Sequence, residues 1–270
     1  MKQNISLEQF PILSKARTKY FCELGQKKYR KERGEFLAEG IRVCYDLLNT
    51  SDYIHTLVFS PKLLSHSRGE ELLAKALLKK IEIFQTSEET LEKMADTCQP
   101  QPVIACLSCC IPPIESAFFD DGRRFLVLCD ISDPGNVGTL LRTAEAFGWD
   151  KILCTGSTAE LYNPKVLRAS MGSAFRLRIV YSELSQVLSF LAQAKIPSLI
   201  TMPREGCIPS QEKMPQRFAL FLGSEAYGLP DSVVKEAAQI LRLPMSPKVE
   251  SLNVAIAGGI ALFLLRDENA

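Results

Sequence analysis

The sequence predicts an α/β protein of two domains, the second built on a mostly parallel sheet. Three observations support this prediction. The chain has 270 residues, of which 46% are hydrophobic, which is sufficient for two buried cores. In the second half, short apolar runs with strand character alternate with segments of helical periodicity, a pattern typical of a parallel sheet with helices on both faces. Between the halves lies Ile111-Pro112-Pro113-Ile114, which can continue neither a helix nor a central strand.

This proline segment separates an N-terminal domain, residues 1–112, from a C-terminal domain, residues 113–270. In the N-terminal domain, residues 12–48 carry apolar side chains at helix-like intervals and are expected to be helical. Apolar runs that predict strands follow at 56–59, 81–84 and 103–107, with helical stretches at 70–80 and 88–94 between them. The N-terminal domain is therefore expected to be a smaller α/β unit.

Basic residues cluster near the N-terminus, although the whole chain is almost neutral with a net charge of +1. Residues 15–42 contain nine Lys or Arg and four Glu. Such asymmetry favours an end of the molecule that contacts phosphates. A solvated helix face is the alternative that charge alone leaves open.

Composition and hydropathy exclude several classes of protein. The longest apolar run, 254–265, is too short to span a bilayer and is expected to be a buried helix. Residues 1–10 lack the apolar core of a signal peptide. The nine cysteines include several within apolar runs, as is typical of small buried side chains in a reducing compartment. We therefore expect a cytoplasmic protein that does not bind membranes.

No sequence motif indicates a metal or a dinucleotide. Cys106 and Cys109 form a CxxC pair, but neither a second pair nor a histidine follows at zinc-ligand spacing, so no metal is expected. No GxGxxG follows the first strand of either half, and there is no GxxxxGK[ST] loop. The two histidines, His55 and His66, both lie in the N-terminal domain. A C-terminal active site would therefore move protons with other groups.

In the C-terminal domain, strands are expected at 125–129, 151–155, 177–181, 198–202, 218–223 and 240–243, with helices between most of them. The first helix is expected to begin at Asn136, as its N-cap, and to reach Phe147, with Gly148 ending it. Ligands of open parallel sheets bind beyond the carboxyl ends of the strands. Residues at these ends are therefore candidates for a functional site.

Three strand ends carry unusual segments. Residues 130–144 combine a Pro-Gly turn with a helix start, whose free N–H groups favour an anion. Glu225 lies between two glycines after the fifth strand, where a carboxylate can accept hydrogen bonds from a ligand's hydroxyl or amine, or hold an arginine. Ser251 and Asn253 open a helix of small residues after the sixth strand. Each segment also has a purely structural explanation, which is an ordinary turn, a turn fixed by Ser224 or Glu225, or an N-cap.

These segments, in this order, resemble the three signature motifs of the SpoU/TrmH family of RNA ribose methyltransferases. The motifs are Asp133-Pro134-Gly135-Asn136-Val137-Gly138 through Arg142-Thr143-Ala144, then Leu222-Gly223-Ser224-Glu225-Ala226-Tyr227-Gly228-Leu229, then Leu243-Pro244-Met245 with Glu250-Ser251-Leu252-Asn253-Val254. Residues 163–172 are similar to the segment that follows the first motif. The N-terminal half resembles the family's substrate-binding domain at residues 27–30, 36–40 and 101–105.

The resemblance implies a C-terminal α/β domain with a trefoil knot, whose loops bind S-adenosylmethionine, and an N-terminal α/β domain that binds RNA. It also implies a homodimer with the active site near the subunit interface, for which the helix at 254–265 is a candidate contact. The residues expected to bind the cofactor are Leu222, Gly223, Ser224, Gly228, Leu243, Pro244, Met245, Ser251 and Leu252. Those expected to bind RNA are Lys27, Lys28, Arg30, Lys31, Arg33 and Arg168.

The resemblance also implies four catalytic residues, Arg142, Asn136, Glu225 and Asn253. Arg142 matches the family's catalytic arginine, which is thought to activate the ribose hydroxyl. Because arginine stays protonated in proteins, it is a poor general base, and it could instead hold the substrate phosphate. The other three residues would position ribose, phosphate and Arg142.

The function that follows is methylation of a ribose 2′-hydroxyl in structured RNA, with S-adenosylmethionine as the methyl donor. The two-domain organisation favours ribosomal RNA over tRNA as the substrate. Two alternatives come from other classes of protein. One is an RNA-binding module of the same fold without catalysis, and the other is an enzyme for a small phosphorylated ligand bound at Asn136.

Overall fold

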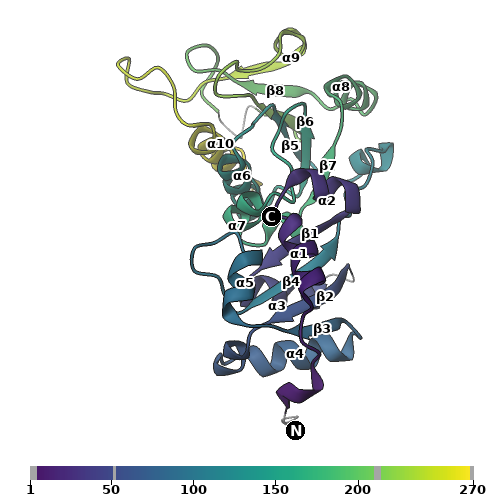
Figure 1. Ribbon diagram of the computed structural model, residues 1–270. Coiled ribbons are helices and arrows are strands. Elements are labelled where there is room, and N and C mark those ends of the chain that lie inside the picture. The colour runs from purple at the N-terminus through teal and green to yellow at the C-terminus, as the bar shows by residue number, and fades with distance from the viewer. Residues whose placement is uncertain (1–4, 51–52, 210–213, 268–270) are drawn as a thin grey trace. The chain divides into compact units, whose positions relative to one another are not determined.

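The computed structural model describes residues 5–50, 53–209 and 214–267. The chain forms two compact units (Figure 1). One comprises Met1–Cys110 with Tyr162–Pro164, and the other comprises Ile111–Leu161 and Lys165–Ala270. Within the described ranges, no helix combines the length and the apolar content needed to cross a membrane. All nine cysteines are free thiols.

The first unit contains a four-stranded sheet with the strand order β1-β4-β2-β3. β4 (Val103–Ser108) is antiparallel to β1 (Glu35–Glu39) and β2 (Ile54–Phe59), whereas β3 (Glu82–Gln85) is parallel to β2. The strands and helices expected between residues 56 and 107 are confirmed. The helices of this unit are α1 (Lys15–Glu23), α2 (Lys27–Arg33), α3 (Ile41–Thr50), α4 (Gly69–Leu78) and α5 (Glu88–Met94), with the short 3-10 helices η1 (Leu7–Gln9) and η2 (Pro61–Ser65).

The continuous helical character expected at residues 12–48 is wrong in its middle. α2 ends at Gly34, whose φ of +65° is a left-handed conformation that glycine adopts at little cost. β1 follows at once, with Phe36 and Ala38 buried and its other side chains half-buried. The strand forms because its backbone pairs with β4, about 70 residues further along the chain. Local periodicity does not contain that contact.

The second unit contains a six-stranded sheet with the order β10-β8-β9-β5-β6-β7, and every pair within it is parallel. All six strands expected from the sequence are confirmed, with ends that differ by at most two residues. The strands are β5 (Arg124–Cys129), β6 (Lys151–Thr155), β7 (Arg178–Tyr181), β8 (Ser198–Thr201), β9 (Phe218–Leu222) and β10 (Gln239–Leu241).

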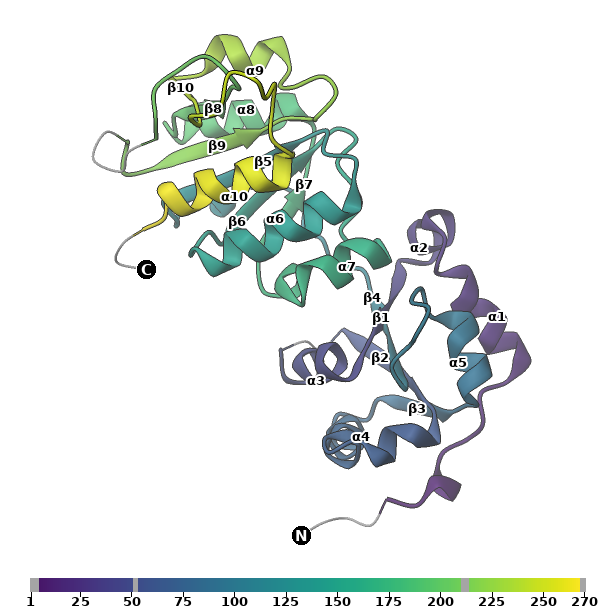
Figure 2. The same cartoon turned by 90° about the vertical axis from the view of Figure 1, so that its left-hand side faces the viewer.

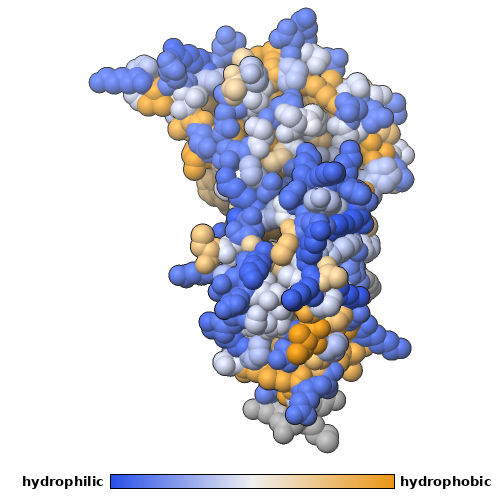
Figure 3. Space-filling view, in the orientation of Figure 1, coloured by the Kyte–Doolittle hydropathy of each residue, from blue (hydrophilic) through white to orange (hydrophobic). Residues whose placement is uncertain are grey.

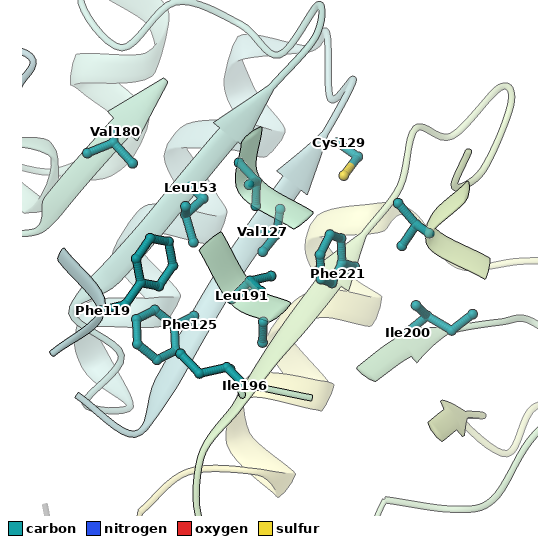
Figure 4. Close-up of a cluster of buried hydrophobic side chains, with 13 residues drawn as sticks. Phe119, Phe125, Val127, Cys129, Leu153, Val180, Leu191, Ile196, Ile200 and Phe221 are labelled. Carbon is teal, nitrogen blue, oxygen red and sulfur yellow. The ribbon is translucent and has the colours of Figure 1, made fainter. Parts of the chain in front are cut away.

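Helices cover both faces of this sheet (Figure 2). Phe125, Val127 and Cys129 of β5 pack on one face with residues of α8 and α9 (Figure 4). On the other face, α6 and α10 lie side by side. Burial of each large apolar side chain stabilises the unit by roughly 1.5–3 kcal/mol. The helices are α6 (Pro134–Ala146), α7 (Pro164–Ser170), α8 (Leu184–Gln193), α9 (Asp231–Glu236) and α10 (Val254–Leu264), with the 3-10 helices η3 (Ser116–Phe119) and η4 (Ser173–Phe175).

Candidate functional site

A cavity of about 510 Å³ lies at the carboxyl ends of β8, β9 and β10, against the start of α10. Its volume is in the range of sites for small organic ligands. Both apolar and polar side chains line it, together with the backbone of the β9 loop. The lining residues are Thr201, Met202, Pro203, Leu222, Gly223, Ser224, Glu225, Gly228, Leu229, Leu243, Met245, Ser251, Leu252, Asn253, Val254 and Ala257.

All of the residues expected to bind the cofactor line this cavity except Pro244. The sequence analysis did not include Thr201, the last residue of β8, or Met202 and Pro203, which follow it. They reach the cavity because β8 pairs with both β9 and β10. Their position at the end of a parallel strand was the one signal that could have identified them.

The start of α6 differs from the expectation in its capping residue. Asp133, rather than Asn136, is the N-cap, and its carboxylate Oδ1 accepts the backbone N–H of Asn136 at 2.9 Å. Lys165 donates to the other carboxylate oxygen at 3.0 Å. The Asn136 N–H and Lys165 hold the pKa of Asp133 below its usual range. Because Asp133 caps the helix, the side chain of Asn136 is left for other contacts.

Three predicted catalytic residues meet in one hydrogen-bond network. Glu225 Oε1 accepts from Asn136 Nδ2 at 2.5 Å and from Asn253 Nδ2 at 3.2 Å. Asn253 Nδ2 also donates to Asn136 Oδ1 at 3.1 Å. The three residues come from α6, the loop after β9 and the start of α10, and Glu225 is exposed. The network thus fixes an accessible carboxylate beside the cavity.

The loop after β9 closes on itself, because the backbones of Ser224 and Gly228 exchange two hydrogen bonds. The Ser224 hydroxyl accepts the N–H groups of Ala226 and Tyr227. A Cβ atom at Gly223 would lie 2.5 Å from the backbone of Gly228, so only glycine fits there. Ser224 therefore fixes the turn, whereas the side chain of Glu225 bonds to the asparagines of other segments.

Arg142 does not join this network. It is exposed on α6, it is not among the residues that line the cavity, and it makes no hydrogen bond or ion pair within the described part of the chain. A spacing of six residues places Arg142 and Asn136 on different faces of the helix. Its solvent-facing neighbours are Thr139 and Ala146. One subunit therefore does not bring all four predicted catalytic residues together.

The predicted RNA-binding residues divide into two groups. Lys27, Lys28 and Lys31 are exposed on α2, and Figure 3 shows a strongly hydrophilic surface over α1 and α2. Arg168 is exposed on α7. The assignment of Arg30 is corrected, because its side chain is buried and its guanidinium donates to the carbonyls of Leu24 and Gly25. Arg33 is half-buried and paired with Glu23.

Two family models match the chain. The SpoU rRNA Methylase family matches residues 123–263, and the MRM3-like substrate binding domain matches residues 15–105. The chain is 26% identical to the 23S rRNA (guanosine(2553)-2′-O)-methyltransferase RlmP of Bacillus subtilis, over 96% of this chain and 100% of that protein. It is 30% identical to an uncharacterised tRNA/rRNA methyltransferase of Synechocystis, over 97% of this chain and 93% of that protein.

The fold is similar to that of an AdoMet-bound rRNA methyltransferase from Sinorhizobium meliloti, with a TM-score of 0.82 and 28% identity. This similarity covers 94% of the present chain and 95% of the other. The family model covers more than half of the chain and includes every residue of the Asn136–Glu225–Asn253 network. The chain therefore belongs to the SpoU rRNA Methylase family.

Proposed function

We propose that the protein transfers a methyl group from S-adenosylmethionine to the 2′-hydroxyl of a ribose in ribosomal RNA. The observation that carries this proposal is the carboxylate of Glu225, held by Asn136 and Asn253 at the edge of a 510 Å³ cavity. The relatives of this protein include a ribosomal RNA 2′-O-methyltransferase that matches the chain over almost its whole length.

The cavity fits S-adenosylmethionine in size and in chemistry. Leu222, Leu243 and Leu252 supply apolar walls for an adenine ring, and Thr201 and Ser251 supply hydroxyl groups. The exposed carboxylate of Glu225 is the charged group of the lining and complements a cationic ligand. The cofactor would supply an electrophilic methyl group on a sulfonium centre.

Glu225 would orient the ribose. Its Oε1 accepts both amide groups, so the rest of the carboxylate can accept a hydrogen bond from a ribose hydroxyl beside the cavity. This hydrogen bond would hold the 2′-oxygen in line with the methyl group that the cofactor supplies, and such alignment would provide much of the acceleration. Asn136 and Asn253 act by fixing the carboxylate.

Arg142 would hold the phosphate next to the reacting ribose. Its guanidinium stays protonated, so it cannot accept the hydroxyl proton, whereas an exposed cation without an internal partner is suited to binding phosphate. Arg168, also exposed, would contribute further positive charge. In this arrangement the phosphate, not the arginine, receives the proton.

The active form is proposed to be a homodimer with its interface at α10. Val254, Gly258 and Leu262 are buried within the subunit. The opposite side exposes Ile256, Ile260 and Phe263, which are 55%, 41% and 45% exposed. An apolar helix face of this kind favours association. α6 packs beside α10, so the interface would place Arg142 close to the second copy.

RNA binding is proposed to use Lys27, Lys28 and Lys31 of α2, together with Tyr227. Tyr227 is 92% exposed on the closed turn beside Glu225, so its ring is available to stack on an unpaired base. We also propose that the C-terminal domain contains a trefoil knot and that the protein is cytoplasmic, as expected from the sequence. Substitution of Lys28 with Ala should weaken RNA binding. It should also reduce the slope of log affinity against log salt concentration by about one, because one fewer counterion is released.

The test is transfer of labelled methyl groups from S-adenosylmethionine to unmodified ribosomal RNA. Wild-type protein should label ribose in ribosomal RNA. Arg142→Ala should reduce the rate about 100-fold or more while cofactor affinity is retained. Arg123→Ala is the matched control, because Arg123 is exposed at the opposite end of the sheet.

Three outcomes would contradict parts of the proposal. Labelling of tRNA in place of ribosomal RNA would change the substrate. RNA binding with no cofactor binding and no transfer would favour an RNA-binding module. Unchanged activity in Arg142→Ala would remove this arginine from the mechanism.

A further inference from the structure

A mixed group of side chains lies on one face of the N-terminal sheet, within the first unit. Glu35 of β1, His55 of β2 and Cys106 of β4 come from three adjacent strands. Each residue offers one ligand atom, and these three atoms all lie within 4.8 Å of one another. Sequence motifs for metal sites have short spacings, whereas these three residues are far apart in the chain, so the sequence pattern does not reveal the group.

A β-bulge brings His55 to this face. Thr56 pairs with Cys106, and Ile54 pairs with Leu107, the very next residue of β4. Because neighbouring residues of a strand point to opposite faces, Ile54 and Thr56 face opposite ways and His55 is the extra residue between them. Regular alternation along β2 therefore does not fix the face of His55, and its ring lies beside Glu35 and Cys106. Such irregularities often redirect a functional side chain.

Two distances within the group are close to those between ligands of tetrahedral zinc. His55 Nε2 lies 3.3 Å from Glu35 Oε1, and Cys106 Sγ lies 3.7 Å from Glu35 Oε2. Bonds of roughly 2.0–2.3 Å to nitrogen, oxygen and sulfur in a tetrahedral site imply separations between ligand atoms of roughly 3.3–3.6 Å. His55 Nε2 is buried and, apart from this contact with Glu35, makes no hydrogen bond within the described residues.

Two further contacts orient the ligand groups, as outer partners do in protein metal sites. The other ring nitrogen of His55, Nδ1, lies 3.0 Å from the hydroxyl of Thr56, which is buried. Tyr20 of α1 donates its hydroxyl to Glu35 Oε2 at 2.8 Å. Arg33 lies over the Tyr20 ring and is paired with Glu23. Its charge is therefore already balanced.

We propose that Glu35, His55 and Cys106 bind one Zn²⁺, with a water molecule completing the coordination. The donor set of one carboxylate, one imidazole and one thiolate suits zinc and disfavours the hard cations Mg²⁺ and Ca²⁺. The side chains of His55 and Glu35 are 37% and 22% exposed, so the group lies close to the surface of the domain. The ion would join β1, β4 and β2 beneath α1 and stabilise the N-terminal domain. This site is independent of methyl transfer.

The test uses the full chain after removal of metal with a chelator. Titration with Co²⁺ should produce thiolate-to-cobalt charge-transfer absorption and tetrahedral d–d bands that reach their maximum at one equivalent. Zn²⁺ should displace the cobalt and raise Tm. In Cys106→Ser the charge-transfer absorption should be lost, and in His55→Gln the affinity should fall about tenfold or more.

Cys109→Ser and His66→Gln are matched controls that should bind Co²⁺ like wild type. Circular dichroism of each metal-free variant distinguishes loss of metal binding from loss of folding. Glu35→Gln is a nearly isosteric substitution of the third ligand. Absence of stoichiometric binding in folded wild-type protein would overturn the proposal. Unchanged charge-transfer absorption in Cys106→Ser would also overturn it.

Discussion

Asn253 uses the two ends of one amide for two purposes. Its Oδ1 accepts the N–H groups of Ala255 and Ile256 and so caps α10, which is the structural role expected from the sequence. Its Nδ2 donates to Glu225 and Asn136, which organises the polar network. A helix cap and a contact within the proposed active site are therefore combined in one residue, and suitable substitutions can separate them.

Asn253→Ser keeps an oxygen that caps the helix but removes the amide donor. We expect methyl transfer to slow roughly 10- to 100-fold, the usual range for a lost hydrogen bond to a charged group, while Tm stays close to that of wild type. Asn253→Ala should show the same loss of rate and should also destabilise the fold by about 1 kcal/mol. Methyl-transfer kinetics and urea unfolding test both variants. Equal unfolding free energies of Asn253→Ser and Asn253→Ala would show that the helix cap contributes little to stability.

Asp133 predicts a dependence of stability on pH. Its folded pKa is depressed by the Asn136 N–H and by Lys165, so the ionised carboxylate stabilises the fold above the unfolded pKa of about 3.9. This contribution is lost as the pH falls through the lower, folded pKa. Asp133→Asn retains a good capping residue and removes the charge. Its unfolding free energy should be lower than that of wild type at pH 7, by less than about 1 kcal/mol because the pair is exposed.

Urea unfolding at a series of pH values checks this expectation. The wild-type and Asp133→Asn curves should converge as the pH falls below about 4. A difference that persists unchanged into acid would show that the charge of Asp133 is not its cause. In a Lys165→Met background, Asp133→Asn should change the unfolding free energy by less, since Lys165 is the cationic partner of Asp133.

At the scale of elements, α10 must approach its neighbours closely. A Cβ atom at Gly258 would lie 2.5 Å from a methyl carbon of Leu140 in α6 and 2.6 Å from one of Leu222 at the end of β9. Both leucines are buried, so neither side chain can move freely. At the next residue, Gly259, the nearest atom would be Thr143 Cγ2 at 3.5 Å, an ordinary contact.

The two glycines form a matched pair of substitutions. Gly258→Ala should destabilise the protein by about 1–3 kcal/mol through overpacking, and it should weaken cofactor binding because Leu222 lines the cavity. Gly259→Ala should be neutral or stabilise by up to about 1 kcal/mol, since alanine favours a helix. Thermal unfolding and cofactor titration test both. Similar destabilisation by the two substitutions would contradict the packing argument.

At the scale of the whole molecule, the exposed face of α10 predicts the state of association. The protein should have twice its chain mass of 30.1 kDa in solution, as measured by light scattering. Ile260→Glu should yield a monomer, because a charge would be buried in an apolar interface, and methyl transfer should fall with it. Ile208→Glu is the control, since Ile208 is exposed on another segment. A stable Ile260→Glu dimer would place the interface elsewhere.

Local sequence was sufficient for much of the secondary structure. Hydrophobic runs, turn residues and caps act within a few residues of one another, so all six strands of the C-terminal domain could be predicted from their own segments. The polar residues at the ends of these strands could likewise be identified from local sequence. β1 was missed because a strand of five residues with one glycine before it depends on a distant partner.

Only tertiary structure decided which distant residues meet. Parallel pairing brings the loops after β8, β9 and β10 to one cavity and gathers Asn136, Glu225 and Asn253 around a single carboxylate oxygen. Burial separated Arg30, which holds carbonyl groups inside the fold, from the exposed lysines of α2. A bulge placed His55 beside Cys106. Each of these outcomes depends on strand register and burial, which are set by contacts between segments far apart in the chain.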